Sequence, residues 1–120
     1  MARTVETLLR ENIHGVFEEQ DAVKRRSKIA SLWAEDGVFI DPDARYEGHT
    51  GVDRAAAGLI KQFPDFVFTE RGIQVFNGVG KLVWGYGPAG KDAVINGIDV
   101  LTMKDDKICA LYTFPEPPEK

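Results

Sequence analysis

Two aspartates stand among apolar residues, and their carboxyl groups are the main candidates for acid–base chemistry. Asp99 lies in the strand-like run 93–103, where the residues on its own side are Ile95, Gly97, Leu101 and Met103. An ionised carboxylate in such surroundings is costly to desolvate, so it either gains partners or keeps its proton at a raised pKa. We interpret Asp99 as a candidate acid or base, with an edge-strand or interface aspartate as the alternative.

Asp41 ends a shorter apolar run and shares a strand face with Phe39. The sequence Asp41-Pro42-Asp43 is also typical of a turn in which the first carboxylate accepts hydrogen bonds from nearby backbone amides. A functional role and a turn role both remain open for Asp41. If both carboxylates face one pocket, they form an acid–base pair.

Three helices are expected to support these aspartates. Apolar residues at helical spacing predict a helix over 4–19, and Asp21 is placed to cap a second one. The basic run 24–26 is expected on the solvent face of that second helix. A third helix is predicted from the start signal Thr50-x-x-Asp53.

The second half of the sequence is predicted to be almost entirely β-strand. Asn77-Gly78 is a strong hairpin signal, and Asp105-Asp106 is expected to join another pair of strands. The predicted strands are 38–41, 46–48 before the third helix, 66–76, 81–86, 93–103 and 107–114. Helices packed on a curved antiparallel sheet give an α+β fold, and a strongly bent sheet makes a cone with a pocket at its mouth.

The composition is typical of one globular domain over residues 1–120, with a polar tail at 115–120. Apolar residues make up 43% of the chain and charged residues 28%, which gives disorder no support. The net charge of -4 argues against nucleic acid or an anionic membrane as the partner. No apolar run approaches the roughly 20 residues that span a bilayer, and the N-terminus does not resemble a signal peptide.

The single cysteine, Cys109, lies in an apolar run and is expected to be a small core residue in a reducing compartment. This favours a cytoplasmic location. Two distant histidines and one cysteine offer no metal-ligand spacing. The segment 85–90 spells the dinucleotide pattern G-x-G-x-x-G, but a strand rather than a helix follows it, so we expect a hairpin turn and no cofactor.

Aromatic side chains are expected to line the pocket. Trp84 and Tyr86 share one face of a strand, and His14 lies at the margin of the apolar stripe of the first helix. For each of these residues, ordinary packing or solvent exposure is the alternative. The candidate substrate-binding residues are His14, Phe17, Trp33, Tyr46, Trp84 and Tyr86.

Several short segments, in order, resemble the nuclear transport factor 2-like superfamily, in its branch of SnoaL-like polyketide cyclases and ketosteroid isomerases. They are residues 32–42, the sequence Tyr46-x-Gly48-His49 and residues 63–66. The resemblance covers nearly the whole chain. It implies a cone-shaped α+β domain, a small hydrophobic ligand, and a homodimer formed through the open sheet face.

The resemblance also implies roles for the two aspartates. The base of ketosteroid isomerases directly precedes a proline, as Asp41 does, and a second, protonated aspartate in an Ile-Asp pair matches Asp99. Those isomerases place a tyrosine near the position of Ile13, whereas this chain has no tyrosine before Tyr46; His14 is a candidate replacement. SnoaL-like cyclases need one acidic base and no cofactor.

The leading prediction is therefore a cofactor-free isomerase or cyclase that moves a proton next to a carbonyl of a small hydrophobic substrate, with Asp41 and Asp99 as the catalytic pair. A non-catalytic ligand-binding or dimerisation module of the same fold is one alternative. An epoxide-hydrolase-like activity is another, because in such members of the superfamily an arginine stands between two aspartates. Arg71 is the candidate arginine for that role, with a place on the solvated face of its strand as the default interpretation.

Overall fold

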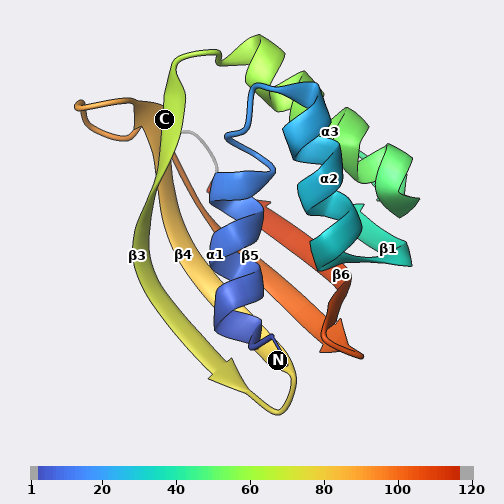
Figure 1. Ribbon diagram of the computed structural model, residues 1–120. Coiled ribbons are helices and arrows are strands. Elements are labelled where there is room, and N and C mark those ends of the chain that lie inside the picture. Colours follow the sequence, from blue (N-terminus) through green and yellow to red (C-terminus); the bar gives the residue numbers. More distant parts are fainter. Residues whose placement is uncertain (1–2, 117–120) are drawn as a thin grey trace.

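The computed structural model describes residues 3–116, in which helices and strands follow one another in the predicted order (Figure 1). The helices are α1 (Val5–Gly15), α2 (Ala22–Leu32) and α3 (Gly48–Gln62). The strands are β1 (Trp33–Ile40), β2 (Arg45–Glu47), β3 (Phe66–Phe76), β4 (Val79–Pro88), β5 (Ile95–Lys104) and β6 (Lys107–Pro115). Of the predicted tail, Pro115 ends β6, and 117–120 lie outside the described residues.

One curved sheet carries all six strands, in the order β2-β1-β6-β5-β4-β3. Neighbouring strands are antiparallel except β1 and β6, which run parallel. The hairpin turns at Asn77-Gly78 and Asp105-Asp106 have positive φ at both residues, as type I′ hairpin turns require. The α+β class and the curved, mainly antiparallel sheet are confirmed.

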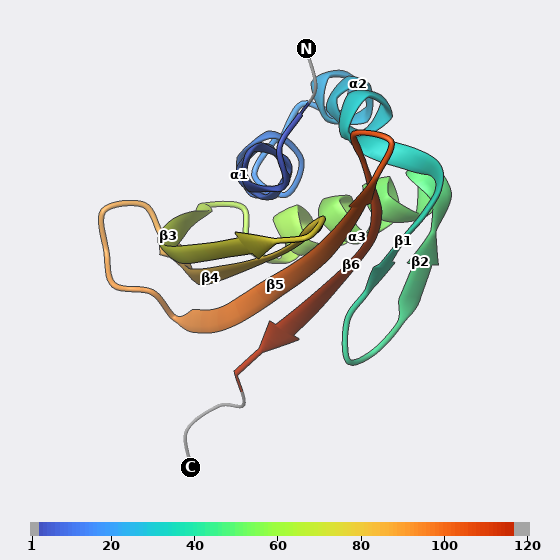
Figure 2. The ribbon, with the colours of Figure 1, turned by 90° about the horizontal axis from the view of Figure 1, so that it is seen from below.

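The helices lie on the concave side of this sheet (Figure 2). Helix α1 contacts β3, β4 and β5, while α3 packs against β1 and β2 and α2 bridges the other two helices. Thr4 caps α1 by accepting from the Thr7 amide, and Asp21 caps α2 as predicted. The core includes Leu8 and Leu9 of α1, which are fully buried. Within residues 3–116, no helix is both long and apolar enough to cross a membrane.

Lys24 and Arg26 of the basic run on α2 are exposed as predicted, but Arg25 is not. Arg25 is only 5% exposed, and its Nε lies 2.7 Å from Oδ1 of Asp53 on α3. Asp53 also accepts from Arg26, so its carboxylate joins two helices rather than capping one. Helix α3 begins earlier than predicted, at Gly48, and has no side-chain cap.

The prediction for Cys109 was also wrong, because the side chain is exposed. The pairing of β5 with β6 shifts by one residue at this point: Met103 pairs with Ile108, but Thr102 pairs with Ala110. Cys109 is the extra residue of this β-bulge, and it points outward while Ile108 is fully buried.

Candidate active site

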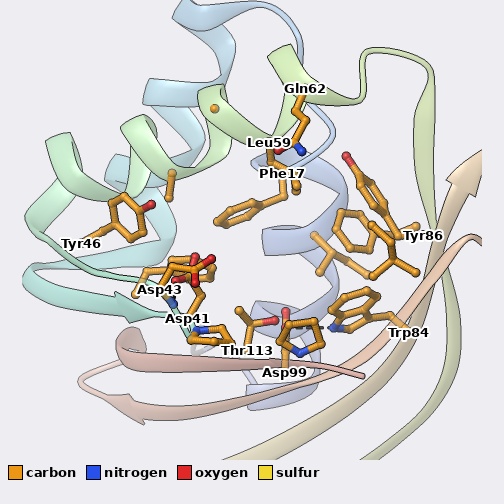
Figure 3. Close-up of a pocket in the computed structure, with 18 of the residues that line it drawn as sticks. Phe17, Asp41, Asp43, Tyr46, Leu59, Gln62, Trp84, Tyr86, Asp99 and Thr113 are labelled. Carbon is orange, nitrogen blue, oxygen red and sulfur yellow. Dashed lines mark hydrogen bonds between the residues drawn. The ribbon is translucent and has the colours of Figure 1, made fainter. Parts of the chain in front are cut away.

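A pocket of about 600 Å³ opens between α1, α3 and the concave face of the sheet (Figure 3). Phe17 enters from the turn directly after α1, Leu59 and Gln62 from α3, and Trp84 and Tyr86 from β4. A pocket of this volume accommodates an organic ligand with several rings. The pocket brings together six of the eight candidate residues: Phe17, Asp41, Tyr46, Trp84, Tyr86 and Asp99.

Asp99 lies on the sheet wall of this pocket and is only 5% exposed. The indole Nε1 of Trp84 donates to its Oδ1 over 2.9 Å. Thr113, which pairs with Asp99 across the β5–β6 ladder, supplies a second side-chain hydrogen bond. Two neutral donors thus hold the carboxyl group in place, and the group still lines the pocket.

Burial raises the pKa of Asp99 from 3.8 to about 6, and the hydrogen bonds from Thr113 and Trp84 oppose this rise without cancelling it. No lysine or arginine pairs with Asp99 among residues 3–116. A carboxyl group with this pKa changes protonation state close to neutral pH. It is therefore suited to accepting and returning a proton.

Asp41 lies at the pocket lining beyond the end of β1 and is tied into a turn. Its Oδ1 accepts from the amides of Asp43 and Ala44, both at 2.8 Å, and its own amide donates to the Ala44 carbonyl. This is the turn geometry that the sequence offered as an alternative. In Figure 3 Asp41 points toward the cavity beside Asp43, so the turn role and a role in the pocket coexist.

Aromatic rings form much of the apolar wall. Tyr86 stacks on Phe68 with ring centroids 4.3 Å apart, and the edge of Trp84 meets the same Phe68 ring at 5.3 Å. Across the pocket, Phe17 contacts Phe39 at 4.9 Å. Since these rings pack against each other, they present a fixed apolar surface to a ligand.

His14 does not line the pocket. Its Nε2 lies 2.9 Å from Glu70 Oε2 and its Nδ1 lies 3.2 Å from Glu18 Oε1, on the half-exposed outer side of α1. Partial burial lowers the pKa of His14, but the bonds to the two carboxylates outweigh it and raise the pKa above 6.5. His14 therefore does not take the place of the missing tyrosine.

Trp33 also lies away from this pocket. It is 1% exposed in the core at the start of β1, where its Nε1 donates to Asn12 Oδ1 over 2.9 Å. Strand β1 begins at Trp33, directly after α2 and five residues earlier than predicted, and the hydrogen bond to Asn12 holds the indole against α1. The packing alternative holds for Trp33.

Four polar residues of the pocket were not predicted from the sequence: Asp43, Arg54, Gln62 and Thr113. Arg54 lies over the ring of Tyr46, 5.5 Å from its centroid, near the pocket mouth. Asp43 lies in the turn between β1 and β2, Arg54 and Gln62 lie on α3, and Thr113 lies near the end of β6. No local sequence pattern marks them as site residues. For Thr113 the only signal is its pairing with Asp99, which depends on the β-bulge.

Residues 3–116 hold no group of three or more His, Cys, Asp or Glu side chains placed to bind a metal ion. The glycines of segment 85–90 lie on β4 and in the turn after it, and β5 follows. This segment therefore lacks the helix N-terminus that would meet a dinucleotide phosphate.

Solved structures share this fold. A candidate isomerase of the SnoaL-like family from Agrobacterium tumefaciens is 22% identical, with 93% of this chain and 97% of that chain covered and a TM-score of 0.86. A candidate SnoaL-like polyketide cyclase from Jannaschia is 16% identical over 93% of this chain and 84% of that chain, with a TM-score of 0.77. A candidate ketosteroid isomerase from Kribbella flavida is 18% identical over 94% and 81%, with a TM-score of 0.68. At these identities the likeness establishes the fold.

Curated proteins gave no match to the sequence. Residues 9–111, which run from α1 to β6, match the SnoaL-like domain family. This match includes Asp41, Asp99 and most of the pocket. The chain belongs to the SnoaL-like domain family.

Proposed function

We propose that this protein is a cofactor-free isomerase or cyclase that moves a proton next to a carbonyl of a small hydrophobic substrate. One observation carries the proposal: the Asp99 carboxyl is buried in the wall of an aromatic pocket, without a cationic partner among the described residues, at a pKa of about 6. The similar structures named as candidate isomerases and a candidate cyclase support it.

In the proposed step, ionised Asp99 takes a proton from the carbon next to the carbonyl. The electrons of the broken C–H bond form an enolate, and the resulting carboxylic acid returns the proton to a carbon of the substrate. Trp84 and Thr113 orient the carboxyl group through their hydrogen bonds. The Tyr46 hydroxyl points into the same pocket in Figure 3 but from the side opposite Trp84 and Asp99, so we assign it no part in this step.

In this proposal Asp41 has a structural role, whereas the family resemblance implies a catalytic one. Its Oδ1 already accepts two backbone hydrogen bonds, which leaves Oδ2 to face a ligand. We propose Asp99 as the base and Asp41 as a residue that fixes the turn at the pocket. A loss of activity in Asp41→Asn as large as in Asp99→Asn would return Asp41 to the catalytic pair.

Deuterium exchange tests the proposed reaction without knowledge of the natural substrate. The ketone 4-phenylcyclohexanone has exchangeable protons next to its carbonyl, and NMR in D₂O follows their replacement. We expect the protein to accelerate exchange, with a rate that rises as Asp99 ionises near pH 6. Asp99→Asn should abolish the acceleration, and Asp65→Asn, which changes an exposed carboxylate between α3 and β3, should keep it.

A non-catalytic ligand-binding module gives a different result in the same experiment. The ketone would bind to the wild-type protein and to Asp99→Asn with equal affinity, and neither would accelerate exchange. That outcome would refute the catalytic proposal. The epoxide-hydrolase alternative has little support, because Arg71 is exposed, does not line the pocket, and bonds to Asn96 instead.

We also propose that two chains associate through the convex face of the sheet. Tyr112 and Phe114 of β6 are 40% and 57% exposed there, beside Val100 and Ile98 of β5 with which they pair. An apolar sheet face of this kind favours an interface between two copies. Light scattering at micromolar concentration should give the mass of a dimer, and a monomer would refute the proposal.

A further inference from the structure

A second pair of polar side chains lies in the pocket, away from Asp99. Figure 3 shows the Tyr86 hydroxyl and the Gln62 amide turned toward one another across the pocket, at the end distant from Asp99 and Thr113. Both residues line the pocket, Tyr86 from β4 and Gln62 from the last turn of α3. The proton-transfer step described above uses neither of them.

The Tyr86 hydroxyl is open to a ligand. Figure 3 marks no hydrogen bond to the Tyr86 hydroxyl. Within residues 3–116, Asn12 Nδ2 is the only fully buried side-chain polar atom that lacks a hydrogen-bond partner. The Tyr86 hydroxyl is therefore not fully buried, and a ligand in the cavity can contact it. Burial, followed by the charge of Glu18, raises the pKa of Tyr86 to about 12, so the hydroxyl keeps its proton at neutral pH. It can therefore donate one hydrogen bond and accept another.

The ring of Tyr86 is held in position by its neighbours. Phe66 meets it edge-on at 5.1 Å and Phe63 at 5.9 Å, while Phe68 stacks on it. The tyrosine is only 2% exposed although its hydroxyl faces the cavity. A hydroxyl fixed in this way costs little conformational entropy when it binds a ligand.

The strand register separates this pair from the proposed base. Tyr86 pairs with Ile95, and Asp99 lies four residues further along β5. Four strand residues span about 13 Å between Cα atoms. The space between contains Trp84 and the apolar wall, so one small polar group does not reach both ends.

We propose that Tyr86 and Gln62 form a second polar anchor, and that the substrate is an elongated molecule with an oxygen function at each end of an apolar body. Its carbonyl lies near Asp99, and a hydroxyl or carbonyl oxygen at the far end binds the Tyr86 hydroxyl and the Gln62 amide. Because the amide both donates and accepts, the anchor takes either group. This inference rests on the proposed function for the orientation of the substrate, and binding measurements test it separately.

Two ketones that differ in one hydroxyl provide the test. In 4-(4-hydroxyphenyl)cyclohexanone the hydroxyl lies at the end opposite the carbonyl, and 4-phenylcyclohexanone lacks it. Calorimetry should show that the hydroxylated ketone binds about two- to tenfold more tightly to the wild-type protein, as one net hydrogen bond allows. Tyr86→Phe and Gln62→Leu should each reduce this advantage and leave the affinity for 4-phenylcyclohexanone nearly unchanged.

Two further variants separate this anchor from the catalytic proposal. Tyr112→Phe, on the convex face of the sheet, should keep the full advantage of the hydroxyl. Asp99→Asn should also bind the hydroxylated ketone more tightly than 4-phenylcyclohexanone, but it should no longer accelerate deuterium exchange. If the wild-type protein shows the affinity advantage of the hydroxyl without accelerating exchange, only the proposed catalytic step is overturned. The second anchor is refuted if neither ketone binds, if the hydroxyl gives no advantage, or if the advantage survives both Tyr86→Phe and Gln62→Leu.

Discussion

Replacing Asp99 with asparagine is expected to stabilise the protein at neutral pH. The buried carboxyl has its pKa raised from 3.8 to about 6, so the folded protein holds a proton there that the unfolded chain has already released. Keeping the ionised group in the folded state therefore costs free energy. Asparagine has similar size and no charge, and its side-chain oxygen still accepts from Trp84 Nε1.

The size of this effect follows from the two pKa values. A rise from 3.8 to about 6 corresponds to about 3 kcal/mol of lost stability once the group is ionised in both states. The loss is nearly absent below about pH 4 and complete above about pH 7, because the folded pKa is the higher one. Asp99→Asn should therefore match the wild type in acid and exceed it by up to about 3 kcal/mol at pH 8.

Urea unfolding between pH 4 and pH 8 measures this difference. His14 also titrates in this range, with a raised pKa, but it is present in both proteins and cancels in their difference. Asp41→Asn is the matched control: asparagine keeps the oxygen that accepts from the turn amides, so its stability should stay within about 0.5 kcal/mol of the wild type. A stability difference for Asp99→Asn that does not grow with pH would contradict the reasoning.

Two pairs of substitutions test the packing around the site by urea unfolding. Arg25→Ala removes a buried guanidinium from its carboxylate partner on α3 and should cost roughly 2 to 3 kcal/mol of stability. The Arg26 side chain is 65% exposed, so Arg26→Ala should cost less than about 1 kcal/mol. Equal losses for the two variants would refute the burial assigned to Arg25. Gly97→Ala would place a Cβ 2.4 Å from the indole of Trp84 and should cost about 1 to 3 kcal/mol. Gly58→Ala adds a Cβ in open space on α3 and should stabilise by about 0.5 to 1 kcal/mol, and a loss there would contradict the helix geometry.

Local signals predicted the elements well, because hairpin turns and apolar periodicity are short-range features. The strand predicted at 66–76 has those bounds in the structure, and Asn77-Gly78 forms its turn. Partners distant in sequence were not predictable in the same way. The ion pair between Arg25 and Asp53 joins two helices, and the sequence alone offers a solvent role for one residue and a capping role for the other.

The candidate site shows the same division. Strand alternation correctly placed Trp84 and Tyr86 together on the face that lines the pocket, and Asp99 faces the same cavity from the next strand. The position of His14 depends on how α1 is rotated against β3, where Glu70 engages the imidazole. Periodicity does not determine that rotation to within one residue.

One β-bulge links the error at Cys109 to the surroundings of Asp99. Counting outward from the Asp105-Asp106 turn in strict pairs, where Lys104 meets Lys107, would set Asp99 opposite Tyr112. The extra residue at Cys109 shifts the ladder by one, so Asp99 pairs with Thr113 and Tyr112 pairs with Val100. Since a shift of one residue exchanges the two faces of a strand, the bulge turns Thr113 toward the pocket and Tyr112 toward the convex face. The hydroxyl beside the proposed base and the apolar surface proposed for dimerisation therefore have a common structural origin in this single residue.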